Sequence, residues 1–172
     1  SDYDRAAPVG TGHVKAGLNY AMSLYAITDA HEQGYDENLY LDSGTRTFVE
    51  ETGGANVLFV TKEGGIVTPK SPTILPSVTR RSLLYVAEHY LHIPAEERPV
   101  RADELGDFTE CGLCGTAAVI SPVGEIDDHD KIYRYGAPEG TESVIGKLYG
   151  TLIGIQHGTI PAPDGWLMEI EK

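Results

Sequence analysis

The chain has 172 residues, of which 41% are hydrophobic and 23% are charged. This composition is ordinary for one globular domain and excludes a disordered chain. Apolar runs stay well short of the roughly 18 residues that a membrane-spanning helix needs, so we expect no membrane partner. The formal net charge of −13 argues against nucleic-acid binding, whereas a few local donors still suffice for a small anion.

Cysteine is scarce, with Cys111 and Cys114 alone in a C-x-x-C arrangement. A secreted disulfide scaffold would contain more cysteines, so we expect a cytoplasmic protein. We predict no metal site, because no second cysteine pair or spaced histidine pair supplies the remaining zinc ligands. The pair falls in a glycine-rich stretch that we interpret as a bend, where both thiols pack and reversible oxidation is left open.

The first half of the chain predicts one helix and several short strands. Residues 1–13 have no apolar periodicity and predict a linker from a further domain. A helix is expected over 19–33, with Met22, Leu24, Tyr25, Ile27 and Ala30 as apolar positions and Gly34 as its stop. Strands expected over 38–41, 46–50, 56–61 and through Ile66 and Val67 form an antiparallel meander.

The second half adds two helices. Pro76 and Ser77 introduce a predicted helix over 78–90, and a last helix is expected over 141–156, ended by Gly158. Between them we expect strands over 99–101, 108–111 and 116–120 and a helical turn over 103–105. The predicted fold class is mixed α and β, an antiparallel-rich sheet packed with helices.

Lys15 differs from the other lysines in lying among small and apolar neighbours just before a helix. Partial desolvation there would make its amine a better nucleophile, and the alternative is a surface lysine in a flexible loop. Glu50 and Glu51 are adjacent at a strand end, so one carboxylate is expected to face water and the other a pocket. Most such acid pairs lie on solvated edges, which is the alternative here.

Two bends offer donors to an anion. Val78 and Thr79 open a helix, where N–H groups lack intrahelical partners and suit a phosphate. The helix dipole contributes about 0.3–1 kcal/mol, so further donors are needed. Gly115 and Thr116 can present a hydroxyl and backbone N–H groups in the same way. The alternatives are an ordinary capped helix start and an ordinary strand bend.

Four blocks in this order resemble the fold-type IV pyridoxal-phosphate aminotransferases, specifically the branched-chain amino acid aminotransferases. They are Lys-Ala-Gly-Leu-Asn-Tyr at 15–20, Glu-Thr-Gly-Gly-Ala-Asn at 51–56, Ile-Leu-Pro-Ser-Val-Thr-Arg at 74–80 and Gly-Thr-Ala-Ala-Val-Ile-Ser-Pro-Val at 115–123. The resemblance covers only that family's C-terminal large domain, an α/β pseudo-barrel. It implies that the N-terminal small domain is missing, that 1–13 is the linker and that 14–172 is the cofactor-binding domain.

The resemblance also implies a role for each candidate residue. Lys15 would be the catalytic lysine that forms the Schiff base with pyridoxal 5'-phosphate and then moves a proton between substrate and cofactor. Glu51 would keep the pyridine nitrogen protonated, and Glu50 would face elsewhere. The other implied cofactor contacts are Tyr20 to the phenolic oxygen, Leu75 to the ring, and Val78, Thr79 and Thr116 to the phosphate. Thr116 and Ala117 would receive the substrate carboxylate.

The implied reaction is transamination between leucine, isoleucine or valine and 2-oxoglutarate by a full-length homodimer, with the isolated domain inactive or nearly so. Leu18 stands where branched-chain enzymes usually have a second glycine. D-amino acid aminotransferases and aminodeoxychorismate lyases often have leucine there, so both remain alternatives. A non-catalytic domain that binds a small anion near Val78 and Thr116 is the alternative from another class.

Overall fold

The computed structural model describes residues 1–168 and 170, so Glu169, Glu171 and Lys172, at the end of the expected 14–172 domain, lie outside the described residues. The helices are α1 (Gly17–Glu32), α2 (Val78–His89) and α3 (Val144–Gln156), with a short 3-10 helix, η1, at Ala102–Asp107. The strands are β1 (Leu39–Leu41), β2 (Phe48–Thr52), β3 (Asn56–Thr61), β4 (Ile66–Pro69), β5 (Ala95–Arg98), β6 (Val100–Arg101), β7 (Phe108–Gly115), β8 (Val119–Val123), β9 (Glu125–Asp128) and β10 (Lys131–Arg134). Among the described residues, none of the helices combines the length and apolar character needed to span a membrane.

A five-stranded sheet of order β5-β4-β3-β7-β8 forms the centre of the molecule, antiparallel except between β4 and β5. Its middle strand, β3, is buried on both faces. Leu58 and Val60 pack in a core with α2 and α3, whereas Val57 and Phe59 belong to a second core. The sequence predicts an apolar strand here, and the two cores explain why residues 57–60 are all apolar, because successive strand side chains alternate between the two faces.

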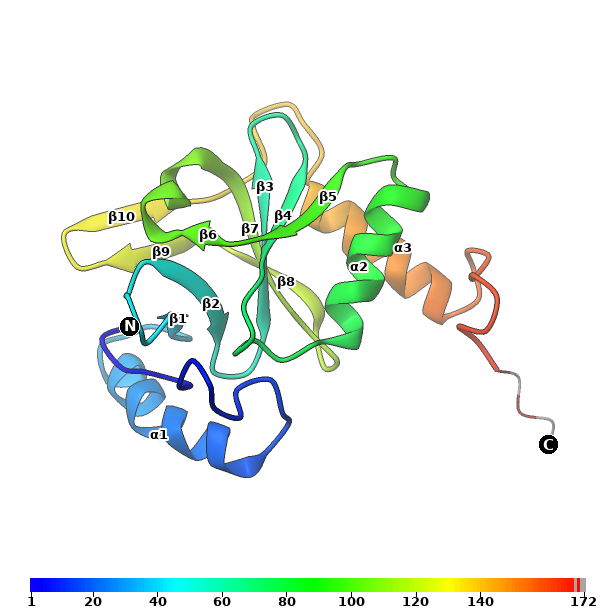
Figure 1. Ribbon diagram of the computed structural model, residues 1–172. Helices are drawn as coiled ribbons and strands as arrows, with labels where there is room; N and C mark the ends of the chain where they lie inside the picture. Colours follow the sequence, from blue (N-terminus) through cyan, green and yellow to red (C-terminus); the bar gives the residue numbers. More distant parts are fainter. Residues whose placement is uncertain (169, 171–172) are drawn as a thin grey trace.

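The second layer consists of a three-stranded sheet, β1-β2-β6, the β9–β10 hairpin and η1. Figure 1 shows α2 and α3 on one side of the central sheet and these elements on the other. The expected meander is therefore split between two sheets. The chain changes sheet at the turn over 52–55, where the Thr52 N–H donates to the Ala55 carbonyl at 2.9 Å.

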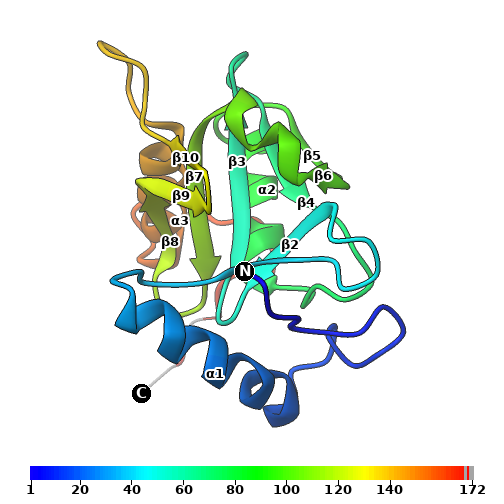
Figure 2. The ribbon, with the colours of Figure 1, turned by 90° about the vertical axis from the view of Figure 1, so that its left-hand side faces the viewer.

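Helix α1 lies below the two sheets in both views, apart from α2 and α3 (Figures 1 and 2). The sequence predicts this helix and its end before Gly34. Of the apolar positions that indicate it, Ala30 is buried and Ile27 is half-buried, whereas Met22, Leu24 and Tyr25 are exposed. The buried positions have small or polar side chains, namely Asn19, Ser23, Ala26 and Ala30. Small side chains let the helix approach the turn after β2 closely, since a Cβ added at Gly53 would lie 3.5 Å from Ser23 Cβ.

Several strand boundaries also differ from the sequence-based expectation. Strand β2 is shifted to 48–52, β7 extends to Gly115, and β8 begins at Val119 because residues 116–118 form the turn. Helix α3 begins at Val144, since the Ser143 hydroxyl accepts the Gly146 N–H at 3.0 Å and caps it. Strands β5, β9 and β10 are missing from the prediction because their charged sequences lack a clear apolar alternation.

Candidate active site

A cleft of about 80 Å³ lies where the loop before α1, the end of β2, the loop before α2 and the β7–β8 turn meet. The predicted site residues that line it are Lys15, Tyr20, Glu51, Leu75 and Thr116. The structure therefore brings together side chains that are far apart in the sequence. The remaining predicted residues, Val78, Thr79 and Ala117, do not line the cleft, although their chain neighbours Ser77 and Thr116 do.

Lys15 and Tyr20 form the outer rim of the cleft. The Lys15 amine donates to the Tyr20 hydroxyl at 3.2 Å, and both side chains are exposed. The expected desolvation of Lys15 is therefore wrong for this chain, because the first turn of α1 borders the cleft and none of the described residues covers the amine. Behind this rim, buried Asn19 donates to the carbonyls of Thr11 (2.8 Å) and Val14 (2.7 Å) and fixes the segment before Lys15.

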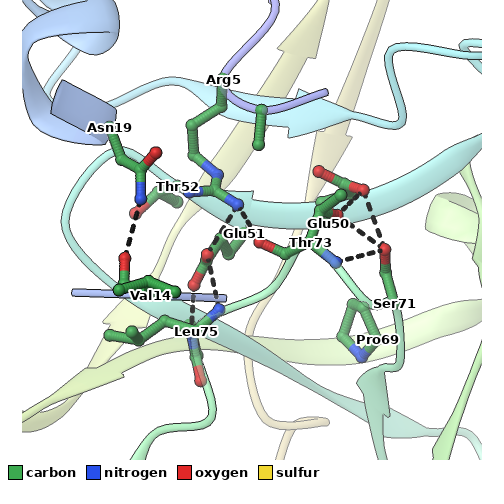
Figure 3. A network of polar contacts seen from close by, with 12 residues as sticks. Arg5, Val14, Asn19, Glu50, Glu51, Thr52, Pro69, Ser71, Thr73 and Leu75 are labelled. Carbon is green, nitrogen blue, oxygen red and sulfur yellow. Dashed lines mark hydrogen bonds and ion pairs between the residues drawn. The ribbon is translucent and has the colours of Figure 1, made fainter. Parts of the chain in front are cut away.

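Glu51 lies at the bottom of the cleft and is 4% exposed. Its Oε1 pairs with Arg5 at 2.9 Å and accepts the Leu75 N–H at 2.9 Å (Figure 3). Its Oε2 accepts a hydrogen bond from Asn56. Burial raises the pKa of Glu51 to about 7, and the Arg5 guanidinium and the Leu75 N–H oppose this rise. A carboxylate offers about four acceptor positions, so Glu51 has capacity left for one more donor from the cleft.

Glu50 is buried as well, at 3% exposed, so the expectation that one carboxylate of the pair faces water is wrong. Its Oε1 accepts from the hydroxyls of Ser71 and Thr73 in the loop before α2. As neighbours on a strand the two carboxylates point to opposite faces of β2. Both faces are covered, because the loop before α2 and the N-terminal segment pack around the end of the strand.

The start of α2 lies at one end of the cleft. The Ser77 hydroxyl accepts the Arg80 N–H at 3.2 Å and caps the helix. The N–H groups of Val78 and Thr79 have no backbone partner within the described part of the chain, as the first turn of a helix predicts. Val78 is 69% exposed, so its side chain takes no part in the cleft. Thr116 and Ala117 lie in the exposed β7–β8 turn.

A larger hollow of about 870 Å³ lies elsewhere, between the second half of α1, β1 and the β8–β9 corner. Its lining contains Asp2, Asp29, Asp127 and Asp128 and, among the described residues, neither lysine nor arginine. A hollow with this charge repels anions. The smaller cleft, with Lys15 and Arg5, is the candidate site for an anionic ligand.

Three residues of the cleft are absent from the sequence-based prediction. Arg5 is 6% exposed and lies against Glu51, although residues 1–13 contain no helix or strand. Asn19 and Asn56 are buried, and the Asn56 Oδ1 has no partner among the described residues. An arginine beside Ala6 and Ala7 in an otherwise acidic terminus is the one local signal for Arg5.

The two cysteines lie in strand β7 rather than in a bend, which corrects the expectation. Three positions apart on a strand, they point to opposite faces, and Cys114 belongs to the core with α2 and α3 while Cys111 belongs to the other core. This arrangement excludes a disulfide between them without rearrangement of β7. Burial raises the pKa of both thiols, that of Cys114 to about 12.

Comparison with known proteins places this chain in a family. Residues 3–126 match the family model described as Amino-transferase class IV, and the chain belongs to that family. The branched-chain-amino-acid aminotransferase of Helicobacter pylori (strain J99) is 49% identical over 168 residues, which are 98% of this chain and 48% of the relative. That of Haemophilus influenzae is 47% identical over 176 residues, 99% of this chain and 51% of the relative. The chain thus spans about half the length of the curated relatives it matches.

The solved structures that resemble the fold of this chain also include branched-chain amino acid aminotransferases. The branched-chain amino acid aminotransferase of Thermobaculum terrenum, in its PLP-bound holo-form, has a TM-score of 0.79 and 34% identity, covering 92% of this chain and 50% of that one. The Escherichia coli branched-chain amino acid aminotransferase has a TM-score of 0.81 and 30% identity, and the match covers 97% of this chain and 54% of that one. These likenesses confirm the predicted mixed α and β class of the fold-type IV enzymes.

Proposed function

We propose that this chain is the pyridoxal phosphate-binding large domain of a branched-chain L-amino acid aminotransferase, with residues 1–13 as the linker from a small domain. One observation supports this most strongly. A lysine amine, a buried carboxylate and a helix start border one cleft in a chain of the class IV aminotransferase family. The named relatives that align with nearly the whole chain are branched-chain enzymes.

The residues of the cleft, together with the start of α2 and the β7–β8 turn beside it, fit pyridoxal phosphate by their donor chemistry. The N–H groups of Val78 and Thr79 and the Thr116 hydroxyl would bind the phosphate, and Leu75 would pack on the ring. Tyr20 would donate to the phenolic oxygen. Glu51 would accept a hydrogen bond from the protonated ring nitrogen, through the acceptor position that its contacts with Arg5, Leu75 and Asn56 leave free. When bound, the cofactor supplies an electron sink for negative charge on the substrate α-carbon.

Lys15 would attach the cofactor and, once released by substrate, would move the proton at the substrate α-carbon. General acid–base catalysis of this kind is typically worth about 10²–10⁴-fold. The N–H groups of Thr116 and Ala117 would orient the substrate carboxylate. Because Lys15 and Tyr20 are exposed in this chain, a further domain would have to exclude water before these contacts reach full strength. We therefore propose that the chain alone is nearly inactive, and that the active form is a cytoplasmic homodimer containing the small domain.

The substrate class is tested on the full-length protein, which contains the proposed small domain, by supplying pyridoxal phosphate, 2-oxoglutarate and one amino donor at a time and measuring glutamate. The proposal predicts glutamate from L-leucine, L-isoleucine and L-valine and none from D-alanine. Transfer from D-alanine, or turnover of aminodeoxychorismate, would instead assign a D-amino acid aminotransferase or a lyase of the same fold. Lys15→Ala is the control, because any remaining glutamate in that variant comes from another enzyme.

A further inference from the structure

Glu50 is a buried carboxylate with no part in the proposed reaction. Its Oε1 accepts hydrogen bonds from the hydroxyls of Ser71 (2.9 Å) and Thr73, whereas its Oε2 has no partner among the described residues (Figure 3). Burying a carboxylate costs free energy that neutral donors recover in part. The side-chain hydrogen bonds of Glu50 both come from the loop before α2, so this buried carboxyl group is connected with the neighbouring cleft through that loop.

The segment that Glu50 holds leads directly into the cleft. The Thr73 carbonyl accepts a hydrogen bond from Arg5, and Arg5 pairs with Glu51 at 2.9 Å. Two residues further on, the Leu75 N–H donates to Glu51 at 2.9 Å. The adjacent carboxylates therefore hold one loop, residues 71–75, at two points. That loop continues through Ser77 into α2.

Side chains, rather than strand pairing, fix this loop to β2. Strand β6 pairs with β2 at Phe48 and Val49, before the two carboxylates. The Ser71 and Thr73 hydroxyls lie 2.7 Å from each other and both reach Glu50, so they form a compact cluster on one carboxylate oxygen. Hydrogen bonds to a charged acceptor are stronger and more directional than those to a neutral one.

We propose that Glu50 is a positioning residue for the cofactor cleft. Through the Ser71 and Thr73 hydroxyls it fixes the loop that places Leu75 and the start of α2. The proposal rests on the proposed function, because this loop would contact the ring and the phosphate of pyridoxal phosphate. Glu50 itself is not among the residues that line the cleft.

The test compares Glu50→Ala, Thr73→Val and the double variant with the wild-type chain. The affinity for pyridoxal phosphate is measured by absorbance titration, and the position of the loop by hydrogen exchange over residues 71–77. Glu110→Ala is the matched control. Glu110 is a carboxylate buried to the same degree that accepts the Ser143 hydroxyl (2.6 Å) and the Val144 N–H (2.9 Å) at the start of α3, outside the cleft lining.

We expect each single variant to bind pyridoxal phosphate about tenfold more weakly, which is the scale of a lost hydrogen bond to a charged group. The double variant is expected to lose little more, because both changes break the same contact. Loop exchange should become faster in all three. Glu110→Ala should leave the affinity and the loop exchange unchanged, even where it lowers stability. Should Glu50→Ala fail to fold, Glu50→Gln, which keeps one acceptor, is expected to show a smaller loss of affinity and a smaller increase in loop exchange than Glu50→Ala.

Two results would overturn the role of Glu50. One is wild-type affinity in the Glu50 variants, and the other is an equal loss of affinity in Glu110→Ala, which would indicate a general effect of stability. Failure of the wild-type chain to bind pyridoxal phosphate is a different outcome. It contradicts the proposed function, and the role of Glu50 at a cofactor cleft fails with it.

Discussion

Glu51 is buried and has three donor groups around its carboxylate. Burial raises its pKa more than the contacts with Arg5 and Leu75 lower it, so the stability of the folded chain is expected to depend on pH. The pKa of Glu51 rises from the ordinary value of 4.5 to about 7 in the folded chain. The folded state therefore binds a proton more tightly than the unfolded state does. The stabilising contribution of this group is complete below about pH 4.5 and is lost as the pH rises through about 7, by on the order of 3 kcal/mol.

The measurement is denaturant unfolding of wild type and Glu51→Gln at a series of pH values from about 4 to 8. We expect the free energy of unfolding of wild type to fall more steeply with pH than that of the variant. Removing the partner of Arg5 shifts the variant's stability at every pH, so the difference in slope is the informative quantity. Parallel slopes would show that Glu51 titrates at its ordinary pKa.

Single site residues are predictable from the sequence where a motif surrounds them. Lys15 and Glu51 lie in such motifs, and both line the cleft. The contact of Arg5 with Glu51 and the burial of Glu50 are not predictable in this way, because they depend on how the N-terminal segment and the loop before α2 fold around β2. Contacts between segments so far apart leave no periodic pattern in either segment.

The two cysteines of strand β7 lie in separate cores, and this placement predicts how they react. Burial raises the pKa of both thiols and keeps them from solvent, so neither is expected to react with a thiol reagent in the native state. Both should react at equal rates after unfolding. The check is a timed thiol titration with and without denaturant, combined with mass analysis after mild oxidation. A disulfide between Cys111 and Cys114 in the native chain would contradict the placement of β7.

Secondary elements are predictable in proportion to the strength of their apolar pattern. The run at 57–60 predicts β3, and Ser77 predicts the start of α2. By contrast, β5 consists of Ala-Glu-Glu-Arg and gains its place by parallel pairing with β4. Helix α1 is only partly predictable. The spacing of its apolar residues indicates a helix correctly, but its large apolar side chains are exposed, so they do not show which face packs against the rest of the chain.

In the whole molecule, the rim of the cleft is exposed, and this exposure bears on how the site is closed. Lys15 and Tyr20 face solvent, and α1 beside them exposes Leu18, Met22 and Tyr25. The chain spans about half the length of the curated relatives it matches. The proposed function therefore assigns cofactor attachment to this chain and assigns the closure of the site to a further domain.

Covalent attachment of pyridoxal phosphate to Lys15 tests this account most directly. The chain is mixed with pyridoxal phosphate, reduced with borohydride, digested and mapped by mass spectrometry. An excess of inorganic phosphate is included in a second sample to compete at the start of α2. Lys62 serves as the internal control, because it is an exposed lysine paired with Asp107 at 3.1 Å outside the cleft lining.

We expect to find the pyridoxyl group on Lys15 well above its level on Lys62, and we expect phosphate to lower the labelling of Lys15 alone. Labelling spread evenly over the exposed lysines, and unchanged by phosphate, would contradict this expectation. Protection by phosphate in thermal unfolding without any selective labelling of Lys15 would instead identify a non-catalytic anion-binding domain.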